Sequence, residues 1–212
     1  MYFRFNLSFR GVVELMAEQG VDVSYETLRR WVGKFGYLYA KRLRDEFERP
    51  SNVWHLDEGF SKINGKKVYI CRTVDVEGTV LDVLDQRHKN HKAELRLLNK
   101  LLRNQGVKPE RIVTDKLRSY GAALKHPGLQ HLQDVGRRKN NRAECSHVPI
   151  RCRERKAQKF RFINSAQRLL SAHSQIYNLF TFRRHLISRS TLRKFRNIAQ
   201  NKRNMATASV CA

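Results

Sequence analysis

An Asn-Gly pair, Asn64-Gly65, stands between two stretches in which apolar and polar side chains alternate. This pair is the strongest two-residue signal for a β-hairpin, because its tight turn needs positive φ angles that asparagine and glycine tolerate. The alternation predicts one strand over Val53–Ile63 and a second over Lys67–Val74. A further turn at Glu77-Gly78 leads to a third strand over Thr79–Leu84, so three antiparallel strands follow one another.

Helical and strand patterns then alternate. The element order β-β-β-α-β-α-β-α predicts an α/β domain, with a mixed sheet and helices on its faces. This is the element order of the ribonuclease H-like fold. The later elements are a leucine-rich helix over about His91–Asn104, a strand over Arg111–Thr114, a brief helix over Ser119–Leu124, a weak strand near Leu129–Gln133 and a helix from Asn141.

Two short helices are predicted within residues 8–34, where Ser8 and Ser24 take N-cap positions and Gly20 ends the first helix. This pattern fits a small helix-turn-helix and an ordinary helical hairpin equally well. A helix-turn-helix normally rests on a further helix ahead of it. Either that helix is truncated here, or a separate helix at about 36–47 supplies the support. In the second helix Leu28, Trp31 and Val32 are expected to face inward, and Tyr25, Arg29 and Arg30 outward towards DNA.

A long helix is predicted at about Ser165–Ile187, where it would cover the sheet or pair subunits, and the basic tail Arg193–Ala212 is expected to be frayed. We therefore divide the chain into three parts. They are an N-terminally shortened helix-turn-helix region at 1–48, a ribonuclease H-like domain at 52–162, and a C-terminal helix with its basic tail at 163–212.

The formal charge of +24 and the isoelectric point near 10.6 exceed what solubility needs. A polyanionic partner is expected, with nucleic acid as the first candidate and an anionic membrane surface as the second. No apolar run approaches the ~20 residues of a membrane-spanning helix, and the N-terminus has no signal-peptide pattern. We expect a cytosolic protein in contact with nucleic acid and not with a membrane.

Three acidic residues, Asp57, Asp115 and Glu144, form the candidate site. Asp57 lies inside the first predicted strand, where a charge needs a counter-charge or a metal. Asp115 ends the fourth strand, and ligands collect at the carboxyl ends of parallel strands. If that strand lies beside the first, both acids point into one cleft. From Arg137 onwards the only acids are Glu144 and Glu154, and the flanking arginines indicate that Glu154 is an ion-pair partner.

Three carboxylates supply the hard oxygen ligands that two Mg²⁺ ions accept, with Mn²⁺ as a substitute. Such a pair of ions promotes in-line displacement at phosphorus. Taken singly, each acid has a simpler reading as a paired strand residue, a turn residue, or an ion-pair partner of Arg142 or Arg151. Taken together, the three acids stand at the three positions expected on one fold, and this favours the metal site over the simpler readings.

Glu144, His147 and Arg151 are spaced i, i+3 and i+7, so they share a face if they lie on one helix. Pro149 stands between them, and an internal proline costs about 3 kcal/mol and kinks a helix. On that face Arg151 would hold a phosphate. His147 would orient Glu144 or contact DNA, or would be a solvated or capping histidine.

Three sequence blocks resemble insertion-sequence transposases of the DDE type, and most closely the sixth insertion-sequence family, whose members form cointegrates. The resemblance extends from about Leu7 to Arg196, and Arg183–Arg189 is also similar to that family. The blocks are Trp54-His55-Leu56-Asp57-Glu58, Val113-Thr114-Asp115-Lys116-Leu117-Arg118-Ser119-Tyr120-Gly121 and Asn140-Asn141-Arg142-Ala143-Glu144-Cys145-Ser146-His147.

The resemblance implies that Asp57, Asp115 and Glu144 are the catalytic acids and that Arg151 is the basic residue that follows the third acid. It implies magnesium-dependent cleavage of the 3′ strand and attack of the freed 3′-hydroxyl on target DNA. The partners it implies are double-stranded DNA, namely the terminal inverted repeats and the target, and further copies of the chain on DNA in the bacterial cytosol at the nucleoid. Further DNA contacts are expected from Arg142, His147 and Arg155.

The chain departs from the family pattern at three points. Only 28 residues separate Asp115 from Glu144, which is short for the family, and Cys145 replaces a polar residue. We also expect that the helix ahead of Leu7–Gly20 is lacking, since only Met1–Asn6 precede it here. A catalytically silent DNA-binding remnant is therefore the alternative, and a ribonuclease H-like nuclease that cleaves without joining is a third reading.

Overall fold

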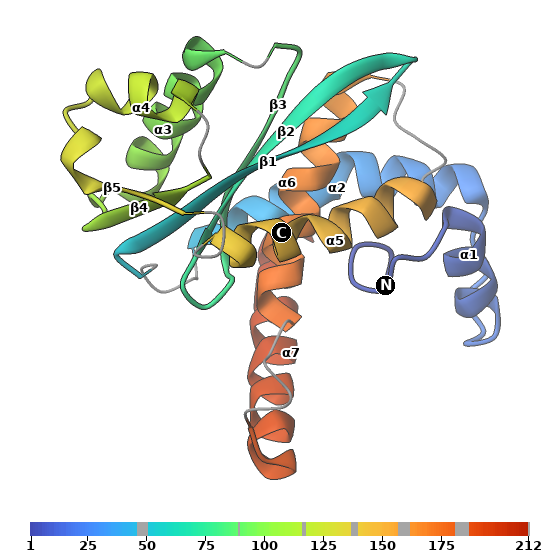
Figure 1. Ribbon diagram of the computed structural model, residues 1–212. Coiled ribbons are helices and arrows are strands. Elements are labelled where there is room, and N and C mark those ends of the chain that lie inside the picture. Colours follow the sequence, from blue (N-terminus) through green and yellow to red (C-terminus); the bar gives the residue numbers. More distant parts are fainter. Residues whose placement is uncertain are drawn as a thin grey trace. The chain divides into compact units, whose positions relative to one another are not determined.

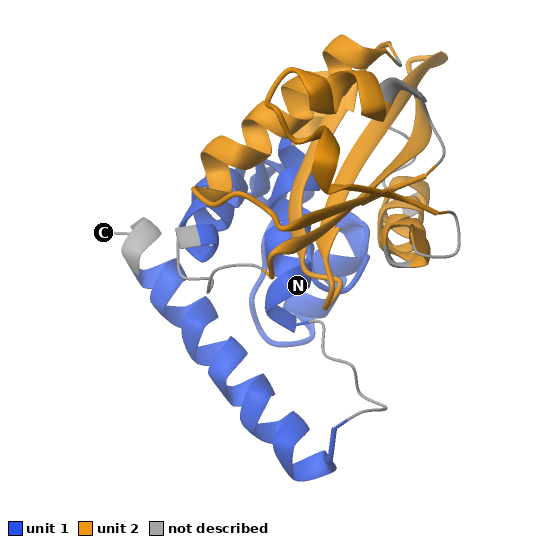
Figure 2. Ribbon diagram, turned by 60° about the vertical axis from the view of Figure 1, so that its left-hand side comes forward, with its two compact units in different colours: residues 1–48, 168–212 blue, residues 49–167 orange. Residues whose placement is uncertain are grey.

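The computed structural model describes residues 1–45, 51–88, 90–115, 118–136, 140–156, 162–180 and 187–211. They form two compact units, one of residues 1–48 with 168–212 and the other of residues 49–167 (Figure 2). The elements, labelled in Figure 1, are α1 (Phe9–Ala17), α2 (Tyr25–Asp45), β1 (Val53–Ile63), β2 (Lys66–Asp75), β3 (Val80–Gln86), α3 (His91–Gln105), β4 (Arg111–Thr114), α4 (Arg118–Lys125), the 3-10 helix η1 (Gln130–Leu132), β5 (Gln133–Val135), α5 (Asn141–Lys156), α6 (Ile163–Phe180) and α7 (Arg189–Cys211).

A five-stranded mixed sheet organises the unit of residues 49–167, in the order β3-β2-β1-β4-β5. The first three strands form an antiparallel meander, whereas β4 and β5 are parallel to β1 and to each other. This topology confirms the ribonuclease H-like fold class. It also confirms that the fourth strand lies directly beside the first, the condition on which the candidate site depended.

The turn chemistry of the sequence produces this meander. Asn64 and Gly65 have φ angles of 49° and 76°, which the β1–β2 hairpin turn requires and which few other residues adopt without strain. The strand β1 has the predicted bounds. Helix α3 begins after Asn90, whose side chain accepts a hydrogen bond from the Ala93 amide, and ends at Gly106 with φ 65°.

The sheet has an apolar core on one face, where α3 lies beside β3 and α4 (Figure 1). Trp54 and Leu56 of β1 are fully buried there, together with Leu97, Leu98 and Leu101 of α3. Because strand side chains alternate between faces, Asp57 and Gly59 point to the opposite face, which α5 covers along β1 and β2. The sheet thus separates its apolar core from the face that carries the acid.

Two predictions near the sheet need correction or completion. The last strand was expected near Leu129–Gln133, but residues 130–132 form a 3-10 turn and the strand begins at Gln133. The predicted long helix over Ser165–Ile187 is α6, which covers 163–180. Its expected extension over 181–186 falls outside the described residues.

The unit of residues 1–48 and 168–212 confirms both N-caps: Ser8 accepts a hydrogen bond from the Gly11 amide, and Ser24 accepts one from the Thr27 amide. The expected separate helix at 36–47 is wrong, because α2 runs without a break from Tyr25 to Asp45. Leu28 is buried as predicted, but Trp31 is 44% exposed and does not face inward.

The expectation of a frayed C-terminal tail is also wrong. Residues 189–211 form the helix α7, whose buried Ala199 and Ala206 pack against Leu43, Ile176 and Leu179. Small side chains at these two positions allow the helix to pack closely, so the basic tail is held by apolar contacts. No helix within the described ranges is both long and apolar enough to cross a membrane.

Candidate active site

The strand register brings the first two acids together. His55 of β1 is paired with Val113 of β4 in the parallel ladder, and Asp57 and Asp115 follow these two residues by the same interval. They therefore lie at one level on neighbouring strands and on the same face. Asp57 comes from within β1 and Asp115 directly follows the end of β4.

The electrostatics of Asp57 show that the third acid is close as well. Burial raises the pKa of Asp57 to about 7, and the negative charges of Asp115, Glu144 and Glu58 add to this increase, against a backbone hydrogen bond at Glu58. The Asp57 side chain is only 13% exposed, so water screens these charges weakly. The structure thus brings together the three acids that the sequence singled out.

Helix α5 positions Glu144 in its first turn, where the side chain is exposed. The start of this helix is tied to the sheet by Asn140, which is buried and donates a hydrogen bond of 2.7 Å to the carbonyl oxygen of Leu56. Leu56 precedes Asp57, so one bond fixes the first turn of α5 beside the first acid. No role was predicted for Asn140, although it stands at the start of the third block.

His147 of α5 is 4% exposed, and its Nε2 atom lies 3.5 Å from Oδ2 of Asp57 on β1. Burial lowers the pKa of His147 to about 4, and the cations Arg72 and Arg151 lower it further, so the ring is neutral at pH 7. Its nearest acid is therefore Asp57, whereas the sequence pattern placed it beside Glu144. Its burial also argues against the direct DNA contact that we predicted for it.

Gly59 leaves the space that the imidazole occupies. A Cβ atom at this position would lie 2.6 Å from Nδ1 of His147 and 3.0 Å from its Cε1. Such contacts are too short for any side chain. The position of the His147 ring therefore requires a glycine at residue 59. The sequence pattern of β1 contains no signal for this requirement, because the residue that needs the space comes from α5.

Pro149 does not interrupt α5, which is one helix from Asn141 to Lys156. Ile150 and Arg153 are each 1% exposed, whereas Arg151 and Arg155 are exposed. Glu154 accepts a hydrogen bond from the Ser61 hydroxyl of β1, a contact that the sequence did not predict. The helix thus has a side fixed to β1 and a side with cations in solvent.

The other residues predicted to bind DNA lie in different environments. Tyr25, Arg29 and Arg30 are exposed on α2, as predicted. Arg29 forms an ion pair of 2.9 Å with Glu26, and the ring edge of Tyr25 contacts Phe9. The side chain of Arg142 lies outside the described residues.

The chemistry of the three acids fits a divalent cation. Burial raises the pKa of Asp57, and repulsion by the other two carboxylates adds to this increase. A bound cation would relieve that repulsion. Within the described ranges, no group of three or more His, Cys, Asp or Glu residues is close enough to hold an ion. Within the described residues, the acids therefore share a region without forming a closed cage.

We expect one substitution to separate packing from chemistry. Gly59→Ala should lower the free energy of unfolding by about 1–3 kcal/mol through overpacking against His147, and should lower strand cleavage through the displaced ring. Gly33→Ala is the matched control, because nothing lies within 4 Å of its added Cβ on α2. Thermal melts and cleavage assays of both variants check this. An unchanged Gly59→Ala protein would contradict the packing of His147 against β1.

A ribonuclease H-like sheet with acids at the middle of β1, directly after β4 and on α5 defines a class, the DDE-type domains that act on nucleic acid. Residues 51–183 match the family described as "DDE domain", of the IS240 type of transposases, and the chain belongs to this family. This confirms the resemblance of the three blocks. Its function is that of a DNA transposase, an enzyme that cleaves and joins DNA strands, and DDE domains generally act with divalent metal ions.

Curated relatives agree with this assignment. The chain is 28% identical over 184 residues to the transposase for insertion sequence-like element IS431mec of Staphylococcus aureus strain Mu50, covering 84% of this chain and 80% of that protein. It is 27% identical over the same shares to the transposase for insertion sequence element IS257 in transposon Tn4003 of Staphylococcus aureus. Among solved structures, a chain of the simian T-cell lymphotropic virus intasome in complex with PP2A regulatory subunit B56 gamma has 14% identity and a TM-score of 0.48, over 64% of this chain and 51% of that chain.

Proposed function

We propose that this transposase catalyses Mg²⁺-dependent cleavage of the 3′ strand at the ends of its element, followed by transfer of that strand to target DNA. Asp57, Asp115 and Glu144 are the catalytic acids and the metal ligands. The observation that carries the proposal is the ladder between β1 and β4, which holds Asp57 level with Asp115, next to the start of α5. The mutual repulsion of the three carboxylates supports it.

Each residue of the site has a distinct task in this proposal. Two Mg²⁺ ions bound by the acids would activate the attacking oxygen and stabilise the leaving one. His147 holds the Asp57 carboxylate in one orientation, and Gly59 gives the ring its space. Arg151 and Arg155 project into solvent from α5, where they hold the phosphates next to the bond that is cut.

Recognition of the element ends belongs to the N-terminal helices in this proposal. Helices α1 and α2, joined across Gly20, act as a helix-turn-helix in which Tyr25, Arg29 and Arg30 contact the inverted repeat. Arg29 has to leave Glu26 to do so. Two ends must meet for transposition, so we also propose that several copies assemble on DNA, in the cytosol.

The deciding experiment incubates the protein with duplexes that carry the element ends and a supercoiled target, with Mg²⁺, with Mn²⁺ or with a chelator. Nicked and joined products in the presence of either metal, and none with the chelator, are expected. Nicking without joining would indicate a nuclease instead. Binding without either product would indicate the silent remnant.

The role of Arg151 gives a separate expectation. Arg151→Gln should weaken binding to duplex DNA and lower the slope of log affinity against log salt by about one, because one phosphate contact is lost. Lys62→Gln, which removes an exposed cation from β1, is the control and should leave the slope unchanged. Titrations by fluorescence anisotropy at several salt concentrations measure both. Equal slopes for the two variants would remove Arg151 from the DNA-binding surface.

A further inference from the structure

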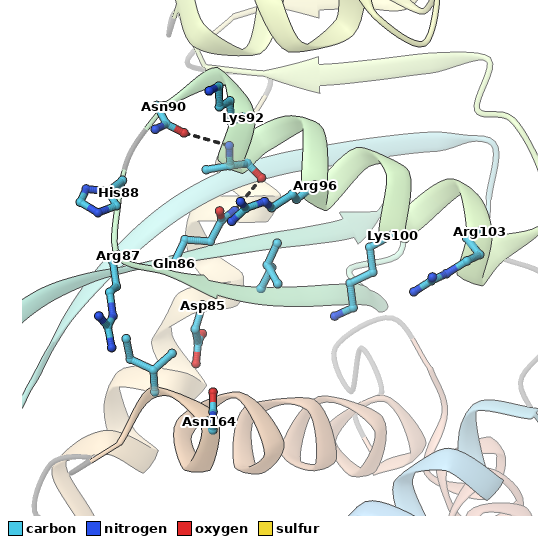
Figure 3. A pocket seen from close by; sticks show the side chains of 13 residues that line it. Asp85, Gln86, Arg87, His88, Asn90, Lys92, Arg96, Lys100, Arg103 and Asn164 are labelled. Carbon is cyan, nitrogen blue, oxygen red and sulfur yellow. Dashed lines mark hydrogen bonds between the residues drawn. The ribbon is translucent and has the colours of Figure 1, made fainter.

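A concave surface with many cations lies at the free edge of the sheet, away from the three acids. It is a cavity of about 560 Å³ beside β3, the edge strand, and we call it the β3 groove. Its walls are α3, the C-terminal end of β3 and the first residues of α6 (Figure 3). Its cationic residues are Arg87, Lys92, Arg96, Lys100 and Arg103.

The cations of α3 form a stripe along one side of the helix. Lys92, Arg96, Lys100 and Arg103 follow one another at spacings of four, four and three residues. Such spacings place side chains on one face, about 6 Å apart along the axis. In Figure 3, Arg96, Lys100 and Arg103 project from α3 towards β3, so the stripe faces the groove.

Few acidic groups compensate this charge. Lys100 is paired with Asp82 at 2.7 Å, whereas Arg87, Lys92, Arg96 and Arg103 form no ion pair within the described part of the chain. Like charges four residues apart destabilise a helix. An arrangement of this kind therefore gains stability when an anion enters the groove.

The one acidic residue that lines the groove does not cancel the charge. Asp85 is 9% exposed and points from β3 towards Asn164 of α6, away from the cations of α3 (Figure 3). Burial raises the pKa of Asp85 to about 7, while Lys100 lowers it, so part of the population is uncharged at neutral pH. The net field in the groove is positive.

The groove continues towards the β1–β2 hairpin. A second hollow, of about 450 Å³, shares Arg87, His88 and Ile163 with it and adds Lys66 and Lys67. These two lysines are exposed, and Lys67 lies over the rings of Phe60 and Tyr69 at 4.8 and 5.0 Å. The two hollows together form one continuous cationic path around the C-terminal end of β3.

We propose that the β3 groove holds the sugar-phosphate backbone of the target duplex. The stripe from Lys92 to Arg103 spans about 16 Å, the length of about five base pairs at 3.4 Å each. A concave surface receives the convex backbone and does not enter the major groove, where base edges are read. It therefore binds without regard to sequence, which fits the target rather than the specified ends.

The position of the groove agrees with this occupant. The ladders place Val83 of β3 opposite Arg72 of β2, and Arg72 opposite Asp57 of β1. The end of β3 is therefore about 10 Å, two strand spacings, from the strand with the first acid. A duplex in the groove therefore lies beside the sheet that carries the acids and leaves the acids themselves free for the element end. This inference rests on the proposed strand transfer.

The test uses the full chain and the double variant Arg96→Gln/Arg103→Gln, with Arg111→Gln/Lys125→Gln as control. All four side chains are charged, and Arg111 and Lys125 are exposed at positions of the same unit outside the groove. Three quantities are measured: cleavage of an end-bearing duplex, transfer of a pre-cleaved end into a plasmid, and the salt dependence of binding to an unrelated duplex.

We expect the groove variant to cleave ends like the wild type and to transfer them at least about 10-fold more slowly at moderate salt. Its slope of log affinity against log salt should fall by about two, one for each lost phosphate contact. The control pair should change neither. Equal losses of cleavage and transfer would make the element end the occupant and overturn the proposal, as would an unchanged slope. A wild type that neither cleaves nor joins would instead refute the proposed function.

Discussion

Asp57→Asn is expected to abolish strand cleavage and strand transfer, lowering both rates by at least about a thousandfold, which corresponds to about 4 kcal/mol of activation free energy. Asparagine has nearly the same shape but offers a neutral oxygen, so it is a poor ligand for Mg²⁺. Binding of duplex DNA should be retained, because the cations of α5 and α3 remain in place.

The control for this prediction is Glu77→Gln, which changes an exposed carboxylate in the β2–β3 turn of the same sheet and should leave activity unchanged. Cleavage and joining are followed on labelled end-bearing duplexes, and binding on the same duplexes without metal. Joining at the wild-type rate by Asp57→Asn would remove this residue from the catalytic site. Loss of binding together with joining would indicate a folding defect instead, which circular dichroism detects.

The fold was accessible from the sequence where local chemistry determines it. The Asn64-Gly65 turn, the alternation of β1 and the leucines of α3 each depend on residues close in the chain, and all three predictions were confirmed. The errors arose where packing between distant segments decides. The tail helix α7 is stabilised by Ala199 and Ala206 against other helices, and composition alone suggests only a basic tail.

In the candidate site, too, features set by the local sequence were predicted and features set by packing between distant segments were not. The three acids were found because each sits in a distinct block at a distinct place on the expected fold. Asn140, Gly59 and the true neighbour of His147 were not found, because their roles depend on how α5 lies over β1. A hydrogen bond to a backbone carbonyl or a missing Cβ leaves no trace in residue spacing.

The surroundings of Asp57 also lower the folding stability of the protein at neutral pH when no metal is bound. Asp57 is largely removed from water and faces the carboxylates of Asp115 and Glu144, while the adjacent His147 ring is neutral at pH 7. Folding at neutral pH therefore places a carboxylate where its charged form is disfavoured. The site is held in this state by the β1–β4 ladder and by the bond from Asn140.

The same Asp57→Asn variant is therefore expected to be more stable than the wild type in metal-free buffer at pH 8. The pKa of Asp57 rises from 3.8 to about 7 on folding, so between these values the folded state holds a proton that the unfolded state has lost. Wild-type stability thus falls as pH rises from about 4 to 7, by up to about 4 kcal/mol. The variant lacks this loss, so the two proteins should have similar melting temperatures at pH 4, and the difference between them should grow up to pH 8.

Mg²⁺ should raise the melting temperature of the wild type more than that of the Asp57→Asn variant. The control is Asp22→Asn, at an exposed position, whose melting temperature should follow that of the wild type at every pH. Thermal melts across this pH range test the prediction, and equal stabilities at pH 8 without metal would show that burial beside the other carboxylates does not disfavour the charged form of Asp57.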